Sequence, residues 1–516
     1  MKTTKRILAT VLAVLMLTML VCTTAFAAPS TNNNSITITN TNANHTYNVY
    51  QIFTGNLYGS TLADIVWGSS VNAAGQAYYT AGASATAGTL KSEADAYAFA
   101  KELIESNHLG APVASGTPTN GTYSVTGLTA GYYLVTDTLA ADVSDEAVSL
   151  YIIRVVGQVN MQPKADVPSV NKMVSRDGIT YDKGISANMS SYVYYELTAS
   201  LSDSILEYEK YYLRFEDTIP SGLTSTSESD FIGVYVVNGQ TDEKMDAQYY
   251  TTTYENGKLI VTIPDIHIAV EATTHTATAV MDTIVVRYKA TLSHTAGTGL
   301  AGGQTNTVTL YYSNDPNEVW TTAPVKQGKT TPSTAVVYTY GITIHKVDSI
   351  NQNTVLQGAT FVMYVNVDGT TQKYLKFDDK GHLEGFVDTI DKATPIVTDA
   401  NGNVTVTGLR SGTYWIHETV APSSYNLNKK DASVTITGAL DRNSGTLGSF
   451  NASHNDGAVS VVANKDTGIA TVTITNVVGA ALPTTGGIGT TIFYAIGAVL
   501  VLGAVVVMLS KKRTNA

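Results

Sequence analysis

Polar and apolar residues alternate with a period of two along much of the chain, which is the pattern of strands with one buried face. The alternation is clearest in six short stretches rich in Thr, Val, Ile and Tyr. They are SITITN at 35–40, KLIVTIP at 258–264, DTIVVRYKATL at 282–292, NTVTLYY at 306–312, YGITIHKV at 340–347 and ATVTITN at 470–476. Only 91–107, with Ala and Leu at helical spacing, predicts a helix. The pattern therefore predicts an all-β protein.

A repeated segment divides the chain into domains. VTGLTAGYYLVTDT at 125–138 matches VTGLRSGTYWIHET at 406–419, and this alignment pairs Asp137 with Glu418. Two domains of one type therefore flank a middle domain of another type. Proline-containing stretches near 161–169 and 323–335 indicate the boundaries. We predict three tandem immunoglobulin-like β-sandwich domains in a rod, at 28–165, 166–335 and 336–480.

Two apolar segments bracket these domains. The first follows a basic start, contains the lone cysteine, Cys22, and ends in small residues, which predicts a secretory signal peptide at 1–27 cleaved after Ala27. The second, 488–510, carries no charge and is followed by three basic residues. Because about 20 apolar residues suffice for a helix to cross a bilayer, this segment predicts a transmembrane span with its basic end in the cytoplasm.

The charge of the exported part excludes one class of function. Removal of 1–27 and of the residues after Thr485 takes away six basic and no acidic residues, which leaves 25 Lys and Arg against 42 Asp and Glu, a net charge of −17. Nucleic-acid binding depends on cationic contacts to phosphate, so this balance argues against nucleic acid as a partner. The exported part also lacks cysteine, which rules out the disulfides that commonly link exported domains.

Three polar residues end runs of inward-facing apolar positions in the C-terminal domain. Strand alternation places Lys346, Glu418 and Asn476 on buried faces. Burying these groups together is costly unless they pair. One interpretation is a Lys–Glu salt bridge. The other is a reaction, in which burial lowers the lysine pKa and raises the carboxyl pKa, and the neutral amine attacks the asparagine carboxamide as ammonia leaves. The residues alone leave both interpretations open.

Motifs of the C-terminal domain resemble those of known surface proteins. ETVAPSSY at 418–425 resembles the glutamate box of collagen-adhesin B-type domains, and TITN at 473–476 resembles their closing strand. The resemblance implies a collagen-adhesin-type sandwich with an isopeptide bond between Lys346 and Asn476. It also implies that Glu418 is the catalytic residue for this bond.

The middle domain contains a second set of such motifs. DTIPSGL at 217–223 and NTVTLYYSNDP at 306–316 resemble segments of pilin middle domains. The resemblance implies a second isopeptide bond, with Lys172 as the amine and Asp217 as the catalyst, and strand alternation turns both side chains inward. The bonded asparagine is Asn306, which lies ahead of the apolar run, or Asn314, which shares its face.

The first domain lacks the amine for such a bond. HTYNVYQIFTG at 45–55 resembles the opening of pilin N-terminal domains, but no lysine lies between Arg6 and Lys91. The opening strand of this domain therefore has no amine to offer. We expect no isopeptide bond there, and no catalytic role for Asp137 despite its alignment with Glu418.

The features at 482–516 follow the order of a wall-sorting signal of Gram-positive surface proteins. An LPxTG motif precedes the apolar segment and the basic tail. Its residues are Leu482, Pro483, Thr484, Thr485 and Gly486. The resemblance implies that a sortase cuts between Thr485 and Gly486 and transfers the Thr485 carbonyl to an amine.

Over nearly its whole length, the chain resembles the major, or backbone, pilin of Gram-positive sortase-assembled pili. This implies a structural shaft subunit, anchored in the cell wall and polymerised with other copies of itself by a pilin-specific sortase. QPKA at 162–165 shares the Pro-Lys core of the pilin motif, usually Y-P-K-N, which implies Lys164 as the acceptor of Thr485. Further implied partners are peptidoglycan, ancillary pilins and a host surface ligand. The alternative is an ancillary pilin or a singly wall-anchored adhesin, which needs no Lys164.

The sequence gives no indication of an enzyme. Beyond self-reaction at Lys172 and Lys346 it shows no catalytic constellation, and its nine histidines have no metal-ligand spacing. We therefore predict no cofactor and no metal site.

Overall fold

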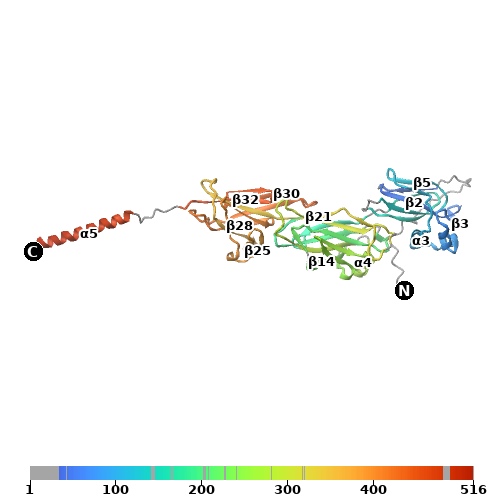
Figure 1. Cartoon of the computed structure of the whole chain (residues 1–516), viewed down its shortest axis with the longest axis horizontal. Helices are drawn as coiled ribbons and strands as arrows, with labels where there is room; N and C mark the ends of the chain where they lie inside the picture. Colours follow the sequence, from blue (N-terminus) through green and yellow to red (C-terminus); the bar gives the residue numbers. More distant parts are fainter. Residues whose placement is uncertain are drawn as a thin grey trace.

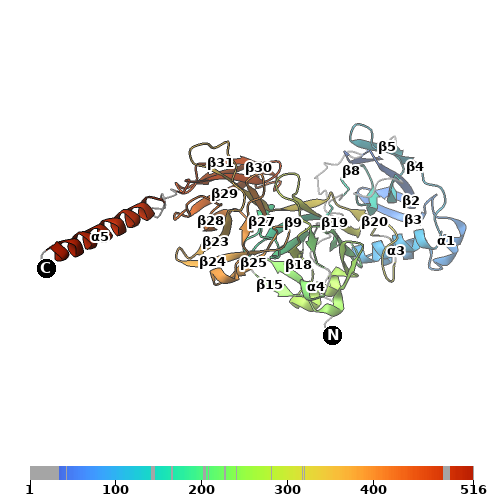
Figure 2. The same cartoon turned by 60° about the vertical axis from the view of Figure 1, so that its left-hand side comes forward.

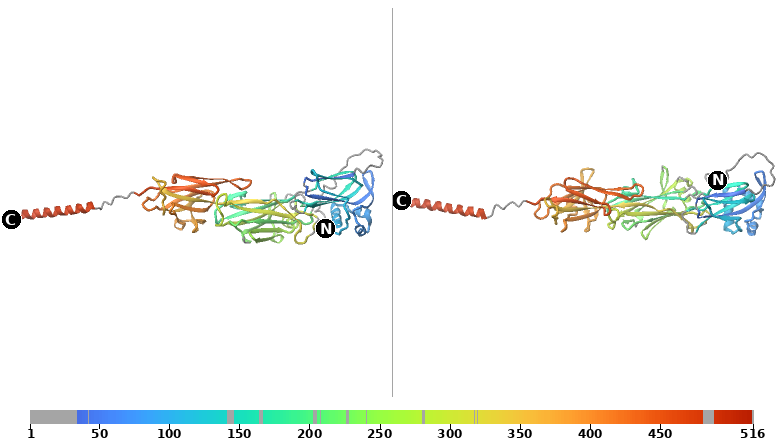
Figure 3. Two further views of the ribbon diagram at one scale, coloured as in Figure 1. Left: turned by 45° about the horizontal axis from the view of Figure 1, so that its top comes forward. Right: turned by 90° about the horizontal axis from the view of Figure 1, so that it is seen from above.

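The computed structural model describes residues 34–514 with short gaps. The gaps are 42, 141–145, 164–166, 202–204, 207, 226–227, 240, 280–281, 317, 319 and 480–487. Three β-rich bodies follow one another along the long axis, and one helix extends beyond the C-terminal body (Figure 1). Two further views show the same row (Figure 3). The predicted all-β fold class is confirmed, while the signal peptide at 1–27 lies outside the described residues.

The N-terminal body holds two sheets and a helical flank. The smaller sheet has the order β5-β1-β8, and the larger has the order β3-β2-β6-β7, with β4 paired to β2. The strands are β1 (Asn34–Thr39), β2 (His45–Tyr58), β3 (Thr61–Trp67), β4 (Ala114–Gly116), β5 (Thr122–Leu128), β6 (Gly131–Leu139), β7 (Leu150–Val155) and β8 (Gln158–Met161). One core, with Ile36 and Val135, contains residues of both sheets. A second, with Phe53 and Leu103, joins the larger sheet to the helices.

The helix predicted at 91–107 is present as α3 (Glu93–Glu105). Its start is fixed by a capping box: the Ser92 hydroxyl accepts a hydrogen bond from the Asp95 N–H, and the Asp95 carboxylate accepts one from the Ser92 N–H. Three further helices were not predicted, namely α1 (Ala73–Tyr78), α2 (Gly82–Thr89) and α4 (Ile266–Thr274). They are too short to show a clear helical period, and IHIAV in α4 alternates as a strand would.

The middle body is a sandwich of two larger sheets. One has the order β15-β14-β18-β11-β9 with β13 on β18, and the other has the order β10-β21-β19-β12-β17-β16 with β20 on β19. The first comprises β9 (Ser169–Ser175), β11 (Tyr192–Ser200), β13 (Leu223–Thr224), β14 (Phe231–Asn238), β15 (Thr241–Lys244) and β18 (Thr283–Leu292). The second comprises β10 (Gly184–Ser186), β12 (Leu213–Thr218), β16 (Thr251–Glu255), β17 (Lys258–Ile263), β19 (Gln304–Ser313), β20 (Gln327–Lys329) and β21 (Ser333–Tyr338). Short 3-10 turns lie at Glu228–Asp230 and Ala247–Tyr249. One continuous core contains residues of both sheets.

The C-terminal body is also a sandwich. Its smaller sheet has the order β27-β22-β32-β31, and its larger sheet has the order β25-β24-β23-β28-β29-β30 with β26 on β23. The smaller sheet comprises β22 (Tyr340–Asp348), β27 (Asn403–Leu409), β31 (Ser460–Asn464) and β32 (Ile469–Asn476). The larger comprises β23 (Thr360–Val367), β24 (Thr371–Phe377), β25 (Leu383–Val387), β26 (Ile396–Val397), β28 (Gly412–Val420), β29 (Ala432–Leu440) and β30 (Leu447–His454), with a 3-10 turn at Ile390–Lys392. The first and last strands of this body, β22 and β32, pair in parallel.

The repeated segment occupies equivalent strands, β6 and β28. In each, the tyrosine that both copies share donates its hydroxyl hydrogen to the carbonyl four residues earlier, from Tyr133 to Thr129 and from Tyr414 to Arg410, both at 2.8 Å. Each strand begins at the aligned glycine, Gly131 or Gly412. The repeat therefore marks one structural element used twice.

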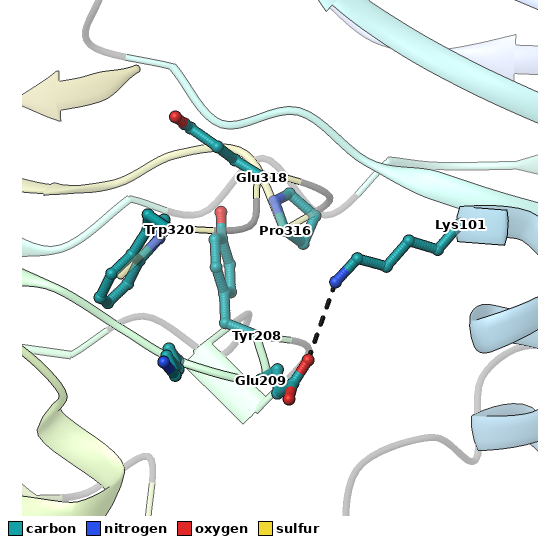
Figure 4. Close-up of a pocket in the computed structure, with 7 residues that line it drawn as sticks. Lys101, Tyr208, Glu209, Pro316, Glu318 and Trp320 are labelled. Atoms are coloured by element: carbon teal, nitrogen blue, oxygen red, sulfur yellow. Dashed lines mark ion pairs between the residues drawn. The ribbon is translucent and has the colours of Figure 1, made fainter. Parts of the chain in front are cut away.

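Each junction between the bodies is held by direct contacts. At the first, Lys101 Nζ lies 3.7 Å from Glu209 Oε2 beside a crevice (Figure 4). The crevice is lined by Lys101, Tyr208, Glu209, Lys210, Pro316, Glu318 and Trp320. At the second, Gly299 meets Gly468 so closely that a Cβ on Gly299 would lie 2.2 Å from the Gly468 nitrogen. Both glycines have positive φ, +69° and +66°, a conformation that also favours glycine.

The C-terminal helix, α5 (Ile488–Thr514), forms where the apolar segment 488–510 lies. Among the described residues, however, no helix combines the length and the apolar character that a membrane crossing demands. The bilayer core requires both properties together, over about 20 residues. The predicted transmembrane span at 488–510 is therefore not supported.

Candidate functional site

The structure brings the three polar residues of the C-terminal domain together. Lys346 on β22 and Asn476 on β32 belong to the smaller sheet, where the parallel register sets Lys346 opposite Ile474. Glu418 belongs to β28 in the facing sheet. Alternation aims all three into the sandwich, and at most 3 % of the surface of any of them is exposed.

Glu418 contacts both the amine and the amide of this cluster. Lys346 Nζ donates a hydrogen bond to Asn476 Oδ1 and lies 3.0 Å from Glu418 Oε1. Asn476 Nδ2 lies 3.1 Å from each Glu418 oxygen and 3.0 Å from the Asn426 carbonyl. Glu418 Oε2 also accepts a hydrogen bond from the Asn428 N–H at 2.6 Å. One carboxyl oxygen, Oε1, is therefore within hydrogen-bonding distance of both nitrogens.

The environment of Lys346 favours its neutral form. Its Nζ lies 5.3 Å from the centre of the Phe361 ring and has no solvent contact. Burial lowers the pKa of Lys346, and the charge and hydrogen bond of Glu418 only partly oppose this effect. A neutral amine has the free electron pair that a nucleophile needs.

The middle domain has a similar cluster built across its two sheets. Lys172 lies on β9 in one sheet, and Asp217 on β12 and Asn306 on β19 lie in the other. None of the three has exposed surface. Lys172 Nζ donates to Asp217 Oδ2 at 2.5 Å and to the Tyr288 hydroxyl at 3.2 Å.

Tyr288 joins the carboxyl group to the amide in this cluster. Its hydroxyl donates to Asp217 Oδ2 at 2.8 Å and accepts from Asn306 Nδ2 at 2.6 Å. The residue comes from β18 in the sheet opposite Asp217. No motif in the sequence singles out Tyr288, although it follows Ile284 and Val286 on the same inward face of DTIVVRYKATL.

Burial shifts the pKa values of both ionisable groups toward their neutral forms. It lowers the pKa of Lys172 to about 8, against the opposing charge of Asp217, and it raises the pKa of Asp217, against the opposing charge of Lys172. Asp217 Oδ1 and Asn306 Oδ1 are buried and have no hydrogen-bond partner among the described residues. A neutral carboxyl group carries a donor that the carboxylate lacks, which reduces the cost of such burial.

The structure separates the two candidate asparagines. Asn306 belongs to the Lys172 cluster through Tyr288, whereas Asn314 faces the N-terminal domain. Asn314 Nδ2 donates to the Glu146 carbonyl at 3.3 Å. The two asparagines are eight positions apart, which corresponds to about 26 Å of extended strand. Parity along the strand could not distinguish them because both lie on the same face.

The N-terminal domain places a histidine beside the residue that aligns with Glu418. His45 is buried between two carboxyl groups, with Nδ1 2.8 Å from Asp137 Oδ1 and Nε2 2.7 Å from Glu146 Oε2. Burial lowers the pKa of His45, but the hydrogen bonds and charges of Asp137 and Glu146 outweigh it, so the pKa is raised above the ordinary 6.5. Burial raises the pKa of Asp137 despite His45.

This arrangement predicts that the stability of the N-terminal domain depends on pH. Because the folded pKa of His45 is raised, its stabilising effect is fully present below about pH 6.5 and is lost as the pH rises through the folded pKa. We expect β2 amides to exchange hydrogen faster at pH 8.5 than at pH 6, after correction for intrinsic rates. The His45→Gln variant should lack this difference. Equal protection of these amides in the wild-type protein at both pH values would contradict a stabilising role for protonated His45.

Several sequence-predicted sites lie outside the described residues. They are the signal cleavage residue Ala27, the acceptor Lys164, and the sorting motif Leu482, Pro483, Thr484, Thr485 and Gly486. The structure therefore describes the two internal clusters, and the sites of processing and polymerisation rest on the sequence and on similar proteins.

Two family models match the chain. A prealbumin-like fold domain matches residues 340–445, and an LPXTG cell wall anchor motif matches residues 475–516. The trypsin-resistant surface T6 protein of Streptococcus pyogenes serotype M6 is 25% identical over 411 residues, which cover 68% of this chain and 70% of the relative.

Solved structures of pilins are similar as well. One is the T6 backbone pilin of serotype M6 Streptococcus pyogenes, which has a modular three-domain structure. The similarity covers 87% of this chain and 100% of the T6 chain, with 19% identity and a TM-score of 0.55. Another is the full-length major pilin SpaD from Corynebacterium diphtheriae. Here the similarity covers 86% of this chain and 98% of the SpaD chain, with 18% identity and a TM-score of 0.47.

The anchor motif and the tandem sandwich fold define an LPXTG-anchored surface protein of the Gram-positive cell wall. Within this class the chain is similar to pilins, as its motifs predicted. The proteins that it resembles are structural subunits and not enzymes, in agreement with the predicted non-enzymatic role.

Proposed function

We propose that this chain is the shaft subunit of a covalent pilus and that it carries two intramolecular isopeptide bonds, Lys346–Asn476 and Lys172–Asn306. The observation that carries the proposal is the pair of buried lysine–carboxyl–asparagine clusters in a chain with an LPXTG anchor. In the proposed polymer, a pilin-specific sortase joins Thr485 of one copy to Lys164 of the next. A final transfer to peptidoglycan anchors the shaft, and ancillary pilins and a host ligand are its further partners.

The contacts of Glu418 support a balanced reaction in the C-terminal domain. The neutral Lys346 amine attacks the carboxamide carbon of Asn476, the new C–N bond forms, and the bond to Nδ2 breaks. Nζ must lose one proton and Nδ2 must gain one for ammonia to leave. Glu418 Oε1 lies 3.0 Å from Nζ and 3.1 Å from Nδ2, so one carboxyl group can accept the first proton and donate the second.

In the middle domain the same proton transfer takes a longer route. Asp217 contacts the Lys172 amine, and the Tyr288 hydroxyl lies between Asp217 and the Asn306 amide. A proton accepted by Asp217 Oδ2 therefore reaches Nδ2 through the Tyr288 hydroxyl. This assigns Tyr288 a role as proton relay in forming the Lys172–Asn306 bond.

The Tyr288→Phe variant tests this relay. We expect the wild-type mature chain to be lighter than its sequence by two molecules of ammonia, and freshly purified Tyr288→Phe to be lighter by one. The second loss should proceed at least about tenfold more slowly, because the general acid–base route is interrupted while the ring still packs. Intact mass spectrometry over time measures both.

The matched control is Tyr235→Phe, on β14 of the same domain, whose ring lies under Arg287 and outside the cluster. It should show the wild-type mass at every time point, corrected for the substitution. Rapid loss of both ammonia molecules in Tyr288→Phe would remove the relay from the mechanism. A wild-type mass equal to the mass calculated from the sequence would show that neither isopeptide bond forms.

A further inference from the structure

Two histidines and an aspartate from different domains meet where the middle and C-terminal domains join. His294 follows β18 in the middle domain, and Asp378 and His382 lie in the turn between β24 and β25. In Figure 2 the middle and C-terminal domains meet in the region where β18 and β25 are labelled, and the contact between His294 and Asp378 crosses this junction. Asp378 Oδ2 is 3.2 Å from His294 Nδ1 and 3.0 Å from His382 Nδ1. The ligand atoms of all three residues lie within 4.8 Å of one another.

The turn holds Asp378 with one oxygen toward the histidines. Its Oδ1 accepts hydrogen bonds from the backbone N–H groups of Lys380 and His382, at 2.9 and 2.8 Å. The other oxygen, Oδ2, faces both histidines.

The two ring nitrogens of His294 face different partners at the junction. Its Nε2 lies 2.9 Å from the Ser190 hydroxyl oxygen, which also lies 3.4 Å from the Leu383 carbonyl oxygen. Its Nδ1 lies 3.2 Å from Asp378 Oδ2. When the Ser190 oxygen accepts a hydrogen bond from Nε2–H, Nδ1 of the neutral ring carries the lone pair that a metal ion binds.

We propose that His294, Asp378 and His382 bind one divalent transition-metal ion of the zinc type, shared by the two domains. Two nitrogens and a carboxylate oxygen are a ligand set that such ions take, with water in the fourth position. In a tetrahedral zinc site the ligand atoms are about 3.3 Å apart, close to the two distances seen here. The hydrogen bond from His294 to Ser190 is the outer contact that fixes the ring of a metal-binding histidine.

The exposure of the site allows an ion to enter. The side chains of His294, Asp378 and His382 are 36%, 21% and 25% exposed. The ion adds to a junction that also has backbone hydrogen bonds, such as Met189 N–H to the Gly408 carbonyl at 2.9 Å, and side-chain ones, such as the Thr298 hydroxyl to the Thr467 carbonyl at 2.7 Å. Binding therefore depends on both domains, and it stabilises one orientation of the pair. This inference is independent of the isopeptide bonds and of polymerisation.

Titration of the untagged mature chain with Zn²⁺ at pH 7.5, followed by isothermal calorimetry, tests the site. We expect one site in the wild-type protein and an affinity at least about tenfold weaker in Asp378→Asn. Asparagine keeps the Oδ1 acceptor of the turn and replaces the ligand oxygen, so the fold is retained. His294→Ala should weaken Zn²⁺ binding as strongly. This variant leaves Asp378 and His382 of the C-terminal domain intact, so it tests whether the site needs its ligand from the middle domain.

His417→Ala is the matched control. His417 is paired with Asp431 at 2.8 Å on the same domain but has no second histidine, so its loss should leave Zn²⁺ binding unchanged. The proposal fails if the wild-type protein binds no Zn²⁺, because the three side chains then only form hydrogen bonds with one another. It also fails if Asp378→Asn and His294→Ala bind as the wild type does, because the ion then lies elsewhere.

Discussion

Replacing Glu418 by alanine is expected to leave Lys346 and Asn476 unlinked and to lower the melting temperature of the C-terminal domain by roughly 15 °C. Among the described residues, Glu418 alone contacts both nitrogens, so the variant lacks the group that carries the proton from the amine to the leaving ammonia. The bond closes a loop between residues 130 apart in sequence. In a chain-entropy treatment such a link stabilises the folded state by about 5 kcal/mol, which is a large fraction of the roughly 5–15 kcal/mol stability of a typical domain.

Differential scanning calorimetry together with intact mass measures this result. Glu418→Ala should be heavier by one ammonia than the wild type, corrected for the substitution. Lys346→Ala should show the same mass difference and a similar melting temperature, because both variants lack the same bond. The control is Glu384→Ala, which breaks an exposed ion pair with Lys376 on the same domain and should shift melting by a few degrees at most.

Two outcomes would contradict the prediction. If Glu418→Ala kept the ammonia deficit, the carboxyl group would have no part in the reaction. If Glu418→Ala lost the ammonia deficit and its C-terminal domain still melted at the wild-type temperature, the bond of the wild-type protein would not stabilise the domain.

Replacing Lys164 by alanine is expected to abolish the polymer. In the proposed shaft this amine accepts the Thr485 carbonyl of the next copy, so without it the sortase can only pass each copy to the wall. Wall material released by muramidase, boiled in detergent and immunoblotted should show a high-mass ladder for the wild type and monomer for Lys164→Ala. Covalent bonds survive the boiling, which separates this ladder from non-covalent assembly.

Lys91→Ala, an exposed lysine of the same N-terminal domain, is the control and should keep the ladder. A ladder in the Lys164→Ala strain would retain the pilus and assign the acceptor to another lysine. Monomer alone in an expressing wild-type strain would favour an ancillary pilin or a singly anchored adhesin, and the shaft function would be withdrawn.

The sequence located the polar clusters because alternation is a local property. Lys346, Glu418 and Asn476 each follow apolar residues of the same parity, and each is buried in the structure. The parity of positions along a strand indicates which face a side chain lies on, but not how far it lies from side chains of other strands. It therefore could not separate Asn306 from Asn314, which the structure places in different surroundings.

Other features depend on contacts between distant segments and left no local signal. Tyr288 enters its cluster from the opposite sheet, and one inward tyrosine among many is not distinctive in a sequence. The ligands of the proposed zinc site come from two domains, with His294 in one and Asp378 and His382 in the other, so no spacing along the chain could reveal them. The short helices α1, α2 and α4 were missed because two turns do not establish a period.

The parallel pairing of β22 and β32 determines how the C-terminal domain transmits force. A pull along the shaft enters at Tyr340 and leaves after Asn476, at opposite ends of two neighbouring strands. With the proposed bond in place, tension passes from Lys346 directly to Asn476. The 130-residue separation between them, about 45 nm of extended chain, bears no load. The domain then behaves as an inextensible link, and the pilus cannot lengthen by unfolding it.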